Sequence, residues 1–393
     1  MHIAIDGRTI LRNRTGVGVY AERLVRSLLE IDRKNEYTLF LLEDDPTFNQ
    51  PNLHKVFITR YAGIGPNRFW ENFILPGYLK TNEVDIFFCP AYILPLLTQS
   101  RKRRNRSHRT KFVVTIHDLV GFIVPETFTL KMRLWQRIFV GNAVRVADRI
   151  LADSESTKHD ILRFYQLNPA LIHVVHLPVG EQFKPISDRA VLDDIRKMYD
   201  LPPKFILYVG TLEPRKNVAR LAHAYVQLPV ELQKEYSLVL VGASGWYSKG
   251  IIEEIESLKV PQRIRQIGYV DQQSLPALYN LASVFAYLSV YEGFGAPPLE
   301  AMACGTPTLT SHSSSLPEAV GDAAALVDPQ NVDAISAILA RLLTDVTLRN
   351  KLSNAGLKHV KNFKALDKAR EVLKIFEEVF ADEEPTNRKP SSP

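Results

Sequence analysis

The stretch VFAYLSVYEGFGAPPLEAMACGTPTLTS (284–311) contains two short apolar runs, separated by a glycine-rich turn and a helix-forming segment. Runs of this length, VFAYLS (284–289) and TPTLTS (306–311), are typical of buried strands. Pro297 and Pro298 open the middle segment, and proline suits a first helical turn because its missing N–H would have no partner there. The stretch therefore predicts a strand–helix–strand unit of a parallel sheet.

The same alternation of short apolar runs and helical patterns extends outward to both ends of the chain. In the C-terminal half the other candidate strands are 204–210, 236–242, 263–268 and 323–328. In the N-terminal half they are 2–6, 37–42, 55–59, 85–89, 111–117, 149–153 and 172–176. Between the two series lies LPVGEQFKPISD (177–188), which has little periodicity and resembles a linker. The restart of the pattern predicts an α/β protein of two Rossmann-like domains, each with a parallel sheet.

Domain boundaries follow from this linker. We expect an N-terminal domain at 1–180, a C-terminal domain at 181–364, an amphipathic helix at 365–381 that packs back toward the N-terminal domain, and a disordered tail at 382–393. At 393 residues the chain is long enough for two hydrophobic cores.

The composition is that of a soluble globular protein. Hydrophobic residues make up 46% and charged residues 23% of the chain, which excludes global disorder. No apolar run reaches the roughly 18–20 residues that span a bilayer, and the N-terminus lacks the pattern of a secretory signal. Cys89 and Cys304 belong to no C-x-x-C pair. We therefore expect a cytoplasmic protein, and its net charge of +6 favours an anionic partner.

The turn in the middle of the 284–311 stretch offers a site for an anion. The backbone N–H groups of Phe294, Gly295 and Ala296 would converge at the positive end of the following helix, which suits phosphate. Glu300 falls about one turn inside this helix, where a carboxylate can accept both hydroxyls of a ribose. Glu292 falls before the turn, where it would meet hydroxyls of a transferred sugar.

The segment GTLEPRKN (210–217) also follows a predicted strand, and it presents Arg215 and Lys216 at the C-terminal edge of the sheet. Ligands bind at that edge in open α/β sheets. Basic side chains there neutralise a diphosphate, also when its charge grows as it departs. Taken alone, this pair is better explained as solvated, and two glutamates on a helix as a solvated face. Because all four residues occur in one half of the chain, we favour a nucleotide-diphosphate site.

Together with SSSLPEAVGDAAALVDP (313–329), these segments resemble the retaining glycosyltransferases of family 4, especially the bacterial mannosyltransferase-like branch. The resemblance implies a GT-B fold, in which two Rossmann-like domains face each other across a cleft. It also implies that Glu300 binds the ribose, Glu292 faces the donor sugar and Lys216 binds the diphosphate.

One position departs from the family pattern. Many members carry arginine directly after the glycine that corresponds to Gly210, whereas this chain has Thr211. We expect Gly210 and Thr211 to line the donor site nevertheless, with Arg215 supplying the missing charge.

In the N-terminal half, IDGRTILRNRTGVGVYAERL (5–24) predicts a strand, a basic loop and a helix opened by Gly16 and Gly18. The segment also satisfies G-x-G-x-x-A, with Glu43 at the end of the next strand, which raises the possibility of dinucleotide binding. The fit is poor, because about ten residues separate the strand from Gly16, where a dinucleotide-binding turn follows at once. In the family that the chain resembles, this loop lies over the donor diphosphate, so both glycines are expected at the donor.

TIHDLVGF (115–122) places His117 and Asp118 at the end of a strand, on the rim of the expected cleft. A lone histidine is more often structural, but the match to the family's H-D pair assigns His117 to the donor sugar, and we count it as catalytic with Glu292, Arg215 and Lys216. Asp118 is assigned to the acceptor side, with capping of the following turn as its alternative. Trp70 and Tyr92 are candidates to line the acceptor groove, although core packing explains either as well.

The run RKRRNRSHRTK (101–111) carries seven Lys or Arg residues. Its simplest interpretation is a solvated loop. Peripheral attachment to the inner face of the plasma membrane is the second, because a basic residue near an anionic leaflet gains roughly 1 kcal/mol. We expect no nucleic-acid partner, since no binding motif accompanies the run.

These features predict a glycosyltransferase that moves a hexose to a hydroxyl of a glycan or lipid-linked saccharide in cell-surface polysaccharide synthesis, with retention at the anomeric carbon. By the resemblance, the donor is GDP-mannose. Because no D-x-D triplet occurs, we expect no metal and no other cofactor. The alternatives are a sugar-nucleotide 2-epimerase of the same fold, and a non-catalytic protein that associates with membrane or nucleic acid.

Overall fold

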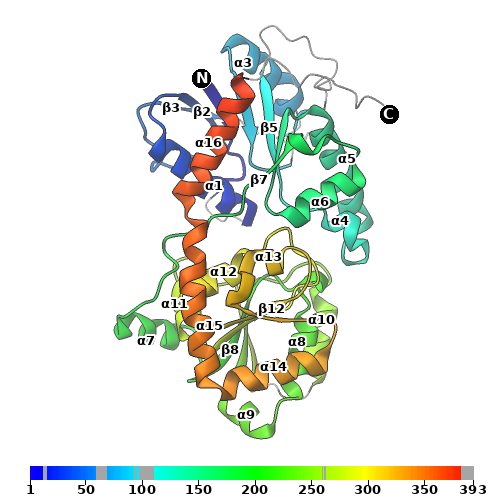
Figure 1. The fold of residues 1–393 in the computed structure, drawn as a ribbon, viewed down its shortest axis with the longest axis vertical. Coiled ribbons are helices and arrows are strands. Elements are labelled where there is room, and N and C mark those ends of the chain that lie inside the picture. Colours follow the sequence, from blue (N-terminus) through cyan, green and yellow to red (C-terminus); the bar gives the residue numbers. More distant parts are fainter. Residues whose placement is uncertain are drawn as a thin grey trace, which may run out of the picture.

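The computed structural model describes residues 1–11, 16–58, 69–92, 94–96, 110–258, 260 and 263–381. Two parallel sheets lie one above the other in Figure 1, each covered by helices. The upper sheet has the order β3-β2-β1-β4-β5-β6-β7 and the lower sheet the order β10-β9-β8-β11-β12-β13. The prediction of an α/β protein with two Rossmann-like domains is therefore confirmed.

The strands of the N-terminal sheet are β1 (His2–Asp6), β2 (Glu36–Leu41), β3 (Leu53–Phe57), β4 (Ile86–Cys89), β5 (Lys111–Ile116), β6 (Arg149–Ala152) and β7 (Ile172–Val174). Those of the C-terminal sheet are β8 (Phe205–Val209), β9 (Ser237–Val241), β10 (Ile264–Gly268), β11 (Val284–Tyr287), β12 (Thr308–Ser311) and β13 (Ala325–Val327). Every strand expected from the sequence forms, with ends no more than two residues from those expected. Short buried runs predict strands well because both faces of a parallel sheet are covered.

The α-helices of the N-terminal half are α1 (Gly16–Ile31), α3 (Leu75–Thr81), α4 (Val120–Ile123), α5 (Leu130–Val146) and α6 (Glu155–Phe164), with a π-helical turn at Trp70–Ile74. The C-terminal half contains α7 (Arg189–Met198), α8 (Val218–Val226), α9 (Val230–Glu235), α10 (Ser248–Ser257), α11 (Leu275–Leu281), α12 (Ala296–Ala303), α13 (Leu316–Val320), α14 (Val332–Thr344), α15 (Val346–His359) and α16 (Ala365–Ala381). Short 3-10 turns occur at Pro125–Thr127, Pro169–Leu171, Pro214–Lys216, Gly321–Ala323 and Val360–Phe363.

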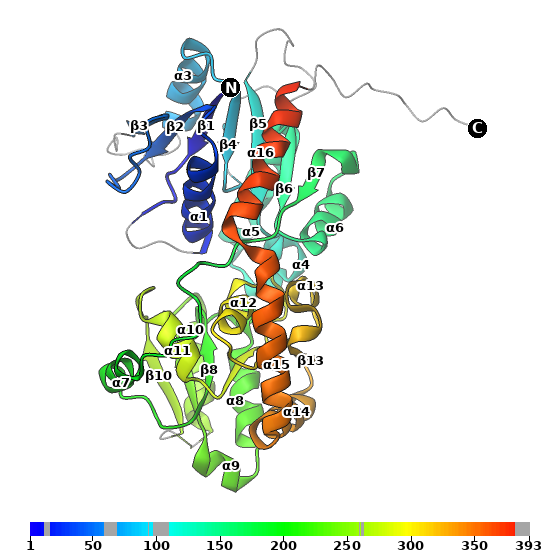
Figure 2. The same ribbon diagram turned by 60° about the vertical axis from the view of Figure 1, so that its left-hand side comes forward.

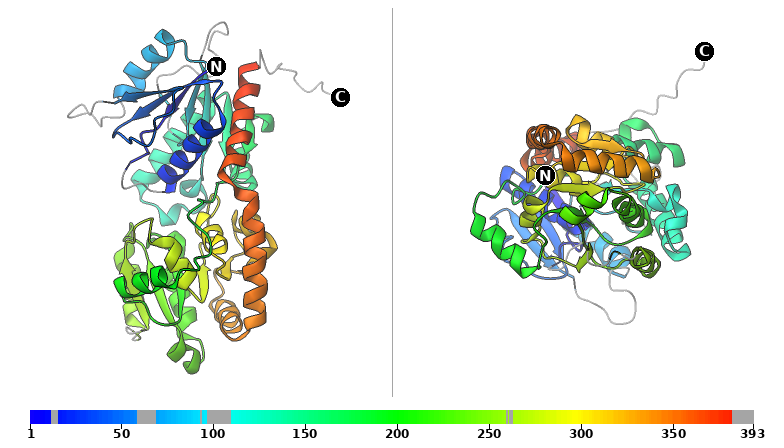
Figure 3. Two further views of the ribbon diagram at one scale, coloured as in Figure 1. Left: turned by 90° about the vertical axis from the view of Figure 1, so that its left-hand side faces the viewer. Right: turned by 90° about the horizontal axis from the view of Figure 1, so that it is seen from below.

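The chain passes between the two halves twice, and the two crossings lie side by side. Val179 forms a parallel bridge with Lys364, and its N–H donates to the carbonyl of Phe363 over 2.9 Å. After the second crossing, α16 returns to the N-terminal half and packs on α1, where Phe376 meets Phe88 with ring centroids 5.3 Å apart. Figures 2 and 3 show α15 and α16 running along both halves on one side. The C-terminal helix thus contributes to the core of the N-terminal half.

Each sheet has a point where its strand order reverses. In the N-terminal sheet this point lies between β1 and β4, and in the C-terminal sheet it lies between β8 and β11. At such a point the loops after the two strands leave toward opposite faces of the sheet, which opens a crevice at the carboxyl ends. The loops after β8 and β11 are therefore the positions where the fold itself predicts a ligand.

Candidate active site

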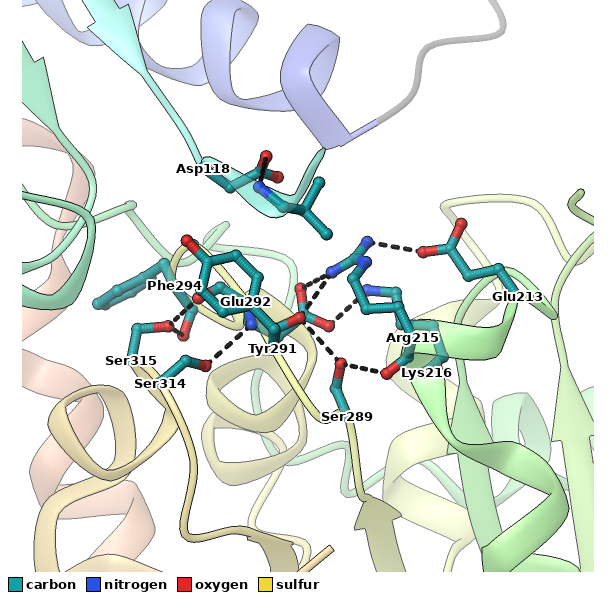
Figure 4. A network of polar contacts seen from close by, with 12 residues as sticks. Asp118, Glu213, Arg215, Lys216, Ser289, Tyr291, Glu292, Phe294, Ser314 and Ser315 are labelled. Carbon is teal, nitrogen blue, oxygen red and sulfur yellow. Dashed lines mark hydrogen bonds and ion pairs between the residues drawn. The ribbon is translucent and has the colours of Figure 1, made fainter. Parts of the chain in front are cut away.

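The loops after β8 and β11 bring Glu292, Arg215 and Lys216 into one buried cluster (Figure 4). Arg215 donates through Nη1 to Oε2 of Glu292 over 2.6 Å, and Lys216 donates through Nζ to Oε1 over 2.7 Å. The Tyr287 hydroxyl donates to the same Oε1 over 2.8 Å. A second carboxylate, Glu213, accepts from Nη2 of Arg215 over 2.7 Å. The cluster therefore contains two cations and two carboxylates.

The protonation of this cluster follows from its contacts. Burial by itself would raise the pKa of Glu292, but Arg215 and Lys216 outweigh it and lower that pKa to about 2. Burial, together with the neighbouring Arg215, lowers the pKa of Lys216 from its ordinary value, although Glu292 opposes this. Glu292 is therefore ionised at neutral pH, and it is a weak base because three donors, two of them cationic, hold its charge.

The backbone of the β11 loop is held by serines. The hydroxyl of Ser315 donates to the carbonyls of Glu292 and Phe294 over 2.9 and 3.0 Å, and Ser314 Oγ accepts from the N–H of Glu292 over 2.9 Å. Ser289 donates to the carbonyl of Arg215 over 3.0 Å, which ties the β11 loop to the β8 loop. The relative positions of the charged side chains are thus fixed by loop backbone.

Helix α12 begins beside this cluster. Gly295 is its N-cap with a φ of 106°, a left-handed conformation that favours glycine, and a Cβ there would meet Leu316 at 2.5 Å. The N–H groups of Phe294, Gly295 and Ala296 donate to no residue that the structure describes. The Phe294 ring points away from Arg215 and stacks on His176 with centroids 5.1 Å apart. The turn therefore presents backbone donors, while its aromatic side chain serves packing.

Glu300 lies further along α12 and is held from both halves of the molecule. Arg23 of α1 lies with Nη2 3.4 Å from Oε1, and the Tyr279 hydroxyl donates to Oε2 over 3.3 Å. Burial raises the pKa of Glu300, with Arg23 opposing it. Glu300, the residue predicted to bind the ribose, thus lies where the N-terminal domain meets the C-terminal domain.

Gly210 and Thr211 lie at the end of β8, both partly exposed. The Thr211 carbonyl accepts from the Tyr208 hydroxyl over 3.2 Å. A Cβ on Gly242 would lie 2.0 Å from the Gly210 carbonyl oxygen, so two glycines pack against each other at the ends of β8 and β9. This packing does not test whether Gly210 and Thr211 contact the donor, which stays a prediction.

His117 lies directly after β5, and both of its ring nitrogens are occupied. Nδ1 lies 2.7 Å from Oδ2 of Asp153, and Nε2 lies 2.8 Å from the Pro90 carbonyl. Two acceptors require two N–H donors, which favours the charged ring. Burial opposes that charge, but Asp153 and the Pro90 carbonyl raise the pKa of His117 above its ordinary value. Contact of His117 with a donor sugar stays a prediction. If a ring nitrogen of His117 bonded to the sugar, that bond would replace the one to Asp153 or the one to Pro90.

Asp118 and Tyr92 lie on the same side of the site. Asp118 lies opposite the charged cluster in Figure 4, and its Oδ1 accepts from the N–H of Val120 over 3.2 Å and from Nε2 of Gln136 over 3.0 Å. Asp118 therefore caps the turn that leads into α4, which is the alternative to an acceptor role that the sequence analysis gave for it. The ring of Tyr92 packs edge-on against His117 with centroids 6.3 Å apart.

Trp70 corrects an expectation. The sequence made it a candidate for the acceptor groove, but its side chain is 4% exposed and lies in the core of the N-terminal domain. There it meets the ring of Phe40 at 4.9 Å and the guanidinium of Arg8 at 4.9 Å. A fully enclosed ring has no face for an acceptor, so Trp70 has a packing role.

The two glycines at the start of α1 differ in their surroundings. Gly16 is exposed, and a Cβ built on it would meet nothing within 4 Å. Gly18 is buried. Residues 12–15 and most of the basic run 101–111 lie outside the described residues, as does the predicted tail at 382–393. Expectations for those segments stay predictions.

The N-terminal domain is bonded to the loop after β11 through hydrogen bonds that the sequence did not predict. The hydroxyl of Tyr291 donates to Oδ2 of Asp160 over 2.8 Å and accepts from the N–H of Leu119 over 3.3 Å. The Gly293 carbonyl accepts from the hydroxyls of Ser154 and Thr157 over 2.6 and 3.1 Å. The residues on either side of Glu292 are therefore bonded to the opposite domain.

A further interdomain contact joins α13 to the N-terminus of α6. Glu318 accepts from the N–H groups of Glu155 and Ser156 over 2.9 and 3.4 Å, and its Oε1 lies 2.7 Å from Nε2 of His176. A carboxylate at a helix N-terminus satisfies otherwise unpaired N–H groups and the helix dipole. Ser154, expected as the cap of this helix, accepts from the N–H of Thr157 and completes the cap.

Two features are absent from the part of the chain that the structure describes, with its residues taken as given above. No group of three or more His, Cys, Asp or Glu side chains among them is arranged to hold a metal ion. No helix among them is both long enough and apolar enough to cross a membrane.

The two domains each have a parallel sheet, and the loop after β11 of the C-terminal sheet is bonded to the residues that follow β5 and β6 of the N-terminal sheet. A buried cluster of charged residues precedes the N-terminus of α12. These features define a protein of the GT-B fold. Two family models match consecutive parts of the chain: Glycosyltransferase Family 4 matches residues 14–182, and Glycosyl transferases group 1 matches residues 193–359. The chain belongs to this family of glycosyltransferases, as its motifs predicted.

Named relatives agree with this membership. The O-antigen chain mannosyltransferase B of Escherichia coli is 36% identical over 251 residues, which cover 64% of this chain and 66% of that protein. The serotype-specific mannosyltransferase WbdA of Escherichia coli is 31% identical over 282 residues, which cover 70% of this chain and 34% of that protein. The matches thus leave a third of the first relative and most of the second uncovered.

A solved structure supports the fold. The crystal structure of Anabaena Alr3699/HepE in complex with UDP and glucose matches with a TM-score of 0.73 at 16% identity, and covers 96% of this chain and 100% of that one.

Proposed function

We propose that this chain is a retaining mannosyltransferase that moves mannose from GDP-mannose to a hydroxyl of a glycan or lipid-linked saccharide in cell-surface polysaccharide synthesis. Both Escherichia coli relatives are named mannosyltransferases, and the first is named for the O-antigen chain, which supports the sugar and the polysaccharide role. The guanine nucleotide rests on the resemblance of the motifs to the mannosyltransferase-like branch.

The observation that carries the proposal is the position of the charged cluster. Arg215 and Lys216, in the loop after β8, pair with Glu292, which shortly precedes the N-terminus of α12. Three backbone N–H groups at that N-terminus have no described partner. Nε of Arg215 is also buried without a hydrogen-bond partner among the described residues. A buried donor left unpaired costs about 1–3 kcal/mol, so an oxygen-rich anion at this place would be stabilised. A diphosphate supplies such oxygens.

In the proposed reaction the bond between the anomeric carbon and the diphosphate oxygen breaks, and a bond to the acceptor oxygen forms on the same face. The departing diphosphate gains charge, which Arg215 and Lys216 stabilise. It also takes the proton of the acceptor hydroxyl. Glu292 is a poor candidate for that proton, because its pKa is lowered to about 2. We assign it instead to orienting the donor sugar.

We propose further that no metal takes part, with the two cations and the α12 N-terminus neutralising the diphosphate. Peripheral membrane attachment through the 101–111 run also stays a proposal. Because Glu300 already contacts Arg23 of the N-terminal domain, a ribose bound by Glu300 would lie at a contact between the domains.

The test uses the purified full-length protein with GDP-mannose, UDP-glucose, UDP-galactose or ADP-glucose and a mannose-terminated oligosaccharide. We expect transfer from GDP-mannose, unchanged by EDTA, and an anomeric configuration in the product that matches the donor by NMR. Loss of turnover in EDTA with recovery on adding a divalent ion would contradict the metal-free account. Formation of a 2-epimer from the donor alone would identify an epimerase. No turnover with any donor, with no nucleotide bound, would favour a non-catalytic role.

A further inference from the structure

Arg23 of α1 extends from the N-terminal half to the point where the chain first crosses to the C-terminal half. Its Nη1 donates to the carbonyl of Pro178 over 3.3 Å, and its Nη2 lies 3.4 Å from Oε1 of Glu300. The guanidinium also lies 5.5 Å from the ring centre of Phe183. The Arg23 side chain is 13% exposed, so these contacts enclose it. A cation of the N-terminal half therefore joins the first crossing to the residue predicted to bind the ribose.

The first crossing leaves room for this guanidinium because residue 180 is a glycine. A Cβ on Gly180 would lie 2.8 Å from Nη2 of Arg23, which is closer than side-chain atoms normally pack. Phe183, three residues later, is buried in the C-terminal core and packs edge-on against Tyr279 with ring centroids 5.8 Å apart. The position of the guanidinium is thus set by the backbone of the crossing and by an aromatic ring anchored in the core.

The two oxygens of Glu300 are held by different halves of the molecule. Oε1 lies beside Arg23 of the N-terminal half, and Oε2 accepts from the Tyr279 hydroxyl of the C-terminal half over 3.3 Å. A carboxylate offers about four acceptor positions. Among the described residues these two side chains take one position each, and the remaining positions suffice for the two hydroxyls of a ribose. A ribose can therefore bind without displacing Arg23.

Arg23 also affects the charge of Glu300. The Glu300 side chain is 12% exposed, and a carboxylate removed from water costs free energy unless a cation pairs with it. Burial raises the pKa of Glu300, and Arg23 opposes that rise, followed by the Tyr279 hydroxyl. A protonated carboxyl group would donate a hydrogen bond of its own and lose acceptor capacity. Loss of Arg23 would therefore weaken the binding of a diol and make it depend on pH.

We propose that Arg23 is a positioning residue of the donor site, which pairs with Glu300 across the domain boundary and holds its carboxylate charged and oriented for the two hydroxyls of a ribose. The inference rests on the proposed function, because it takes Glu300 as the residue that binds the ribose. Since Arg23 and Glu300 belong to different halves, full affinity for the ribose requires that the halves be in contact. A nucleotide would then favour the state in which the two domains meet over one in which they are apart.

The test measures, by isothermal titration, the affinity of the full-length protein for GDP and for 2′,3′-dideoxy-GDP, which lacks both ribose hydroxyls. For the unaltered protein we expect GDP to bind roughly tenfold or more tightly, as for hydrogen bonds to a charged group. Arg23→Met keeps a long apolar side chain and removes the charge. This variant should reduce the ratio to roughly threefold or less and leave the binding of 2′,3′-dideoxy-GDP unchanged.

The pH dependence separates loss of the pairing charge from a structural defect. The affinity of Arg23→Met for GDP should fall between about pH 8 and about pH 6 by more than that of the unaltered protein, because an unpaired Glu300 takes up a proton as the pH falls. Arg23→Lys, which retains a charge, should restore part of the ratio and lessen this extra pH dependence. Gly180→Ala, which displaces the guanidinium without removing it, should lower the ratio in the same direction.

Arg26→Met is the matched control, because Arg26 lies on the same helix and pairs with Glu22 and Asp45. It should bind both ligands as the unaltered protein does, and circular dichroism checks that every variant is folded. An unchanged ratio in Arg23→Met would overturn the assignment and leave the proposed function standing, as would an equal weakening of both ligands.

Two results with the unaltered protein concern the proposed function itself. Binding of UDP in place of GDP would contradict the proposed donor, and the comparison of UDP with its 2′,3′-dideoxy form would then decide the role of Arg23. Binding of neither nucleotide would overturn the proposed function and this inference together.

Discussion

Nη1 of Arg215 lies 2.6 Å from Oε2 of Glu292, although the two residues belong to loops that follow different strands of the C-terminal sheet. This ion pair, with Lys216 on the other carboxylate oxygen, holds the cations in place before any donor arrives. Preorganised charge costs no rearrangement when a diphosphate departs, which is where electrostatic catalysis gains most. The pairing also keeps Glu292 charged and fixed in orientation.

Removal of either partner should therefore lower turnover, besides any loss of stability from the partner left buried. We expect Lys216→Ala and Glu292→Gln to lower kcat/KM by roughly 100-fold or more, as for other lost transition-state contacts. Lys249→Ala and Glu253→Gln replace an exposed pair on α10 and serve as matched controls, with unchanged kinetics expected. Activity within a few-fold of the unaltered protein in both site variants would remove this cluster from the mechanism.

Gly293 should tolerate no side chain. A Cβ at this position would lie 1.8 Å from the backbone oxygen of His117, in the opposite domain. Because backbone is on both sides of this contact, Gly293→Ala should force the domains apart and lower kcat/KM at least roughly tenfold. Gly250→Ala on α10, where a Cβ meets nothing within 4 Å, should leave activity intact. Small-angle scattering of the Gly293 variant should show an expanded molecule, and an unchanged profile with full activity would contradict this reading.

Tyr291 should couple domain contact to the active site. Tyr291→Phe removes the bond to Asp160 and the acceptor for the Leu119 N–H, and leaves both groups buried. An unsatisfied buried group costs about 1–3 kcal/mol, so kcat/KM should fall roughly tenfold while each domain stays folded. Tyr225→Phe removes a bond of 2.8 Å within the C-terminal domain and should lower the melting temperature without this kinetic effect. Equal kinetic losses in both variants would assign the effect to general stability.

The His117–Asp153 pair should make stability depend on pH. The folded-state pKa of His117 is raised above the ordinary value of 6.5, with Asp153 outweighing burial. Its contribution to stability is then fully present below pH 6.5 and is lost as the pH rises through the folded-state pKa. The melting temperature of the unaltered protein should exceed that of His117→Gln most at or below pH 6.5 and by less at higher pH.

NMR provides the direct check on this pair. The His117 ring should titrate above pH 6.5, whereas His173, whose pKa is lowered by burial and by Arg149, should titrate below it. A neutral His117 ring at pH 6 would refute the assignment.

The fold could be predicted from the sequence because periodicity is a local property. Short apolar runs such as 205–209 are buried on both faces, so each strand is visible without its neighbours. The charged residues of the site could also be located, since the carboxyl ends of β8 and β11 meet at the switch point of the sheet.

Contacts between the domains could not be predicted. Tyr291 and Asp160 are separated by 131 positions, and nothing in either segment indicates the other. Arg23 reaches Glu300 from a helix whose pattern shows which face is buried but not what lies opposite. Trp70 illustrates the same limit, because an aromatic residue near a cleft and one in the core have the same local sequence. Such relationships depend on how the two halves of the molecule meet.

We expect Arg215, Lys216 and the α12 N-terminus to hold a diphosphate. Isothermal titration of GDP and of guanosine isolates this contribution, because the two ligands differ only in the diphosphate. For the unaltered protein we predict that GDP binds roughly 100-fold or more tightly than guanosine, and that Arg215→Met/Lys216→Met reduces this ratio to roughly tenfold or less while guanosine binding is unchanged. A double variant that keeps the full preference for GDP would contradict the account.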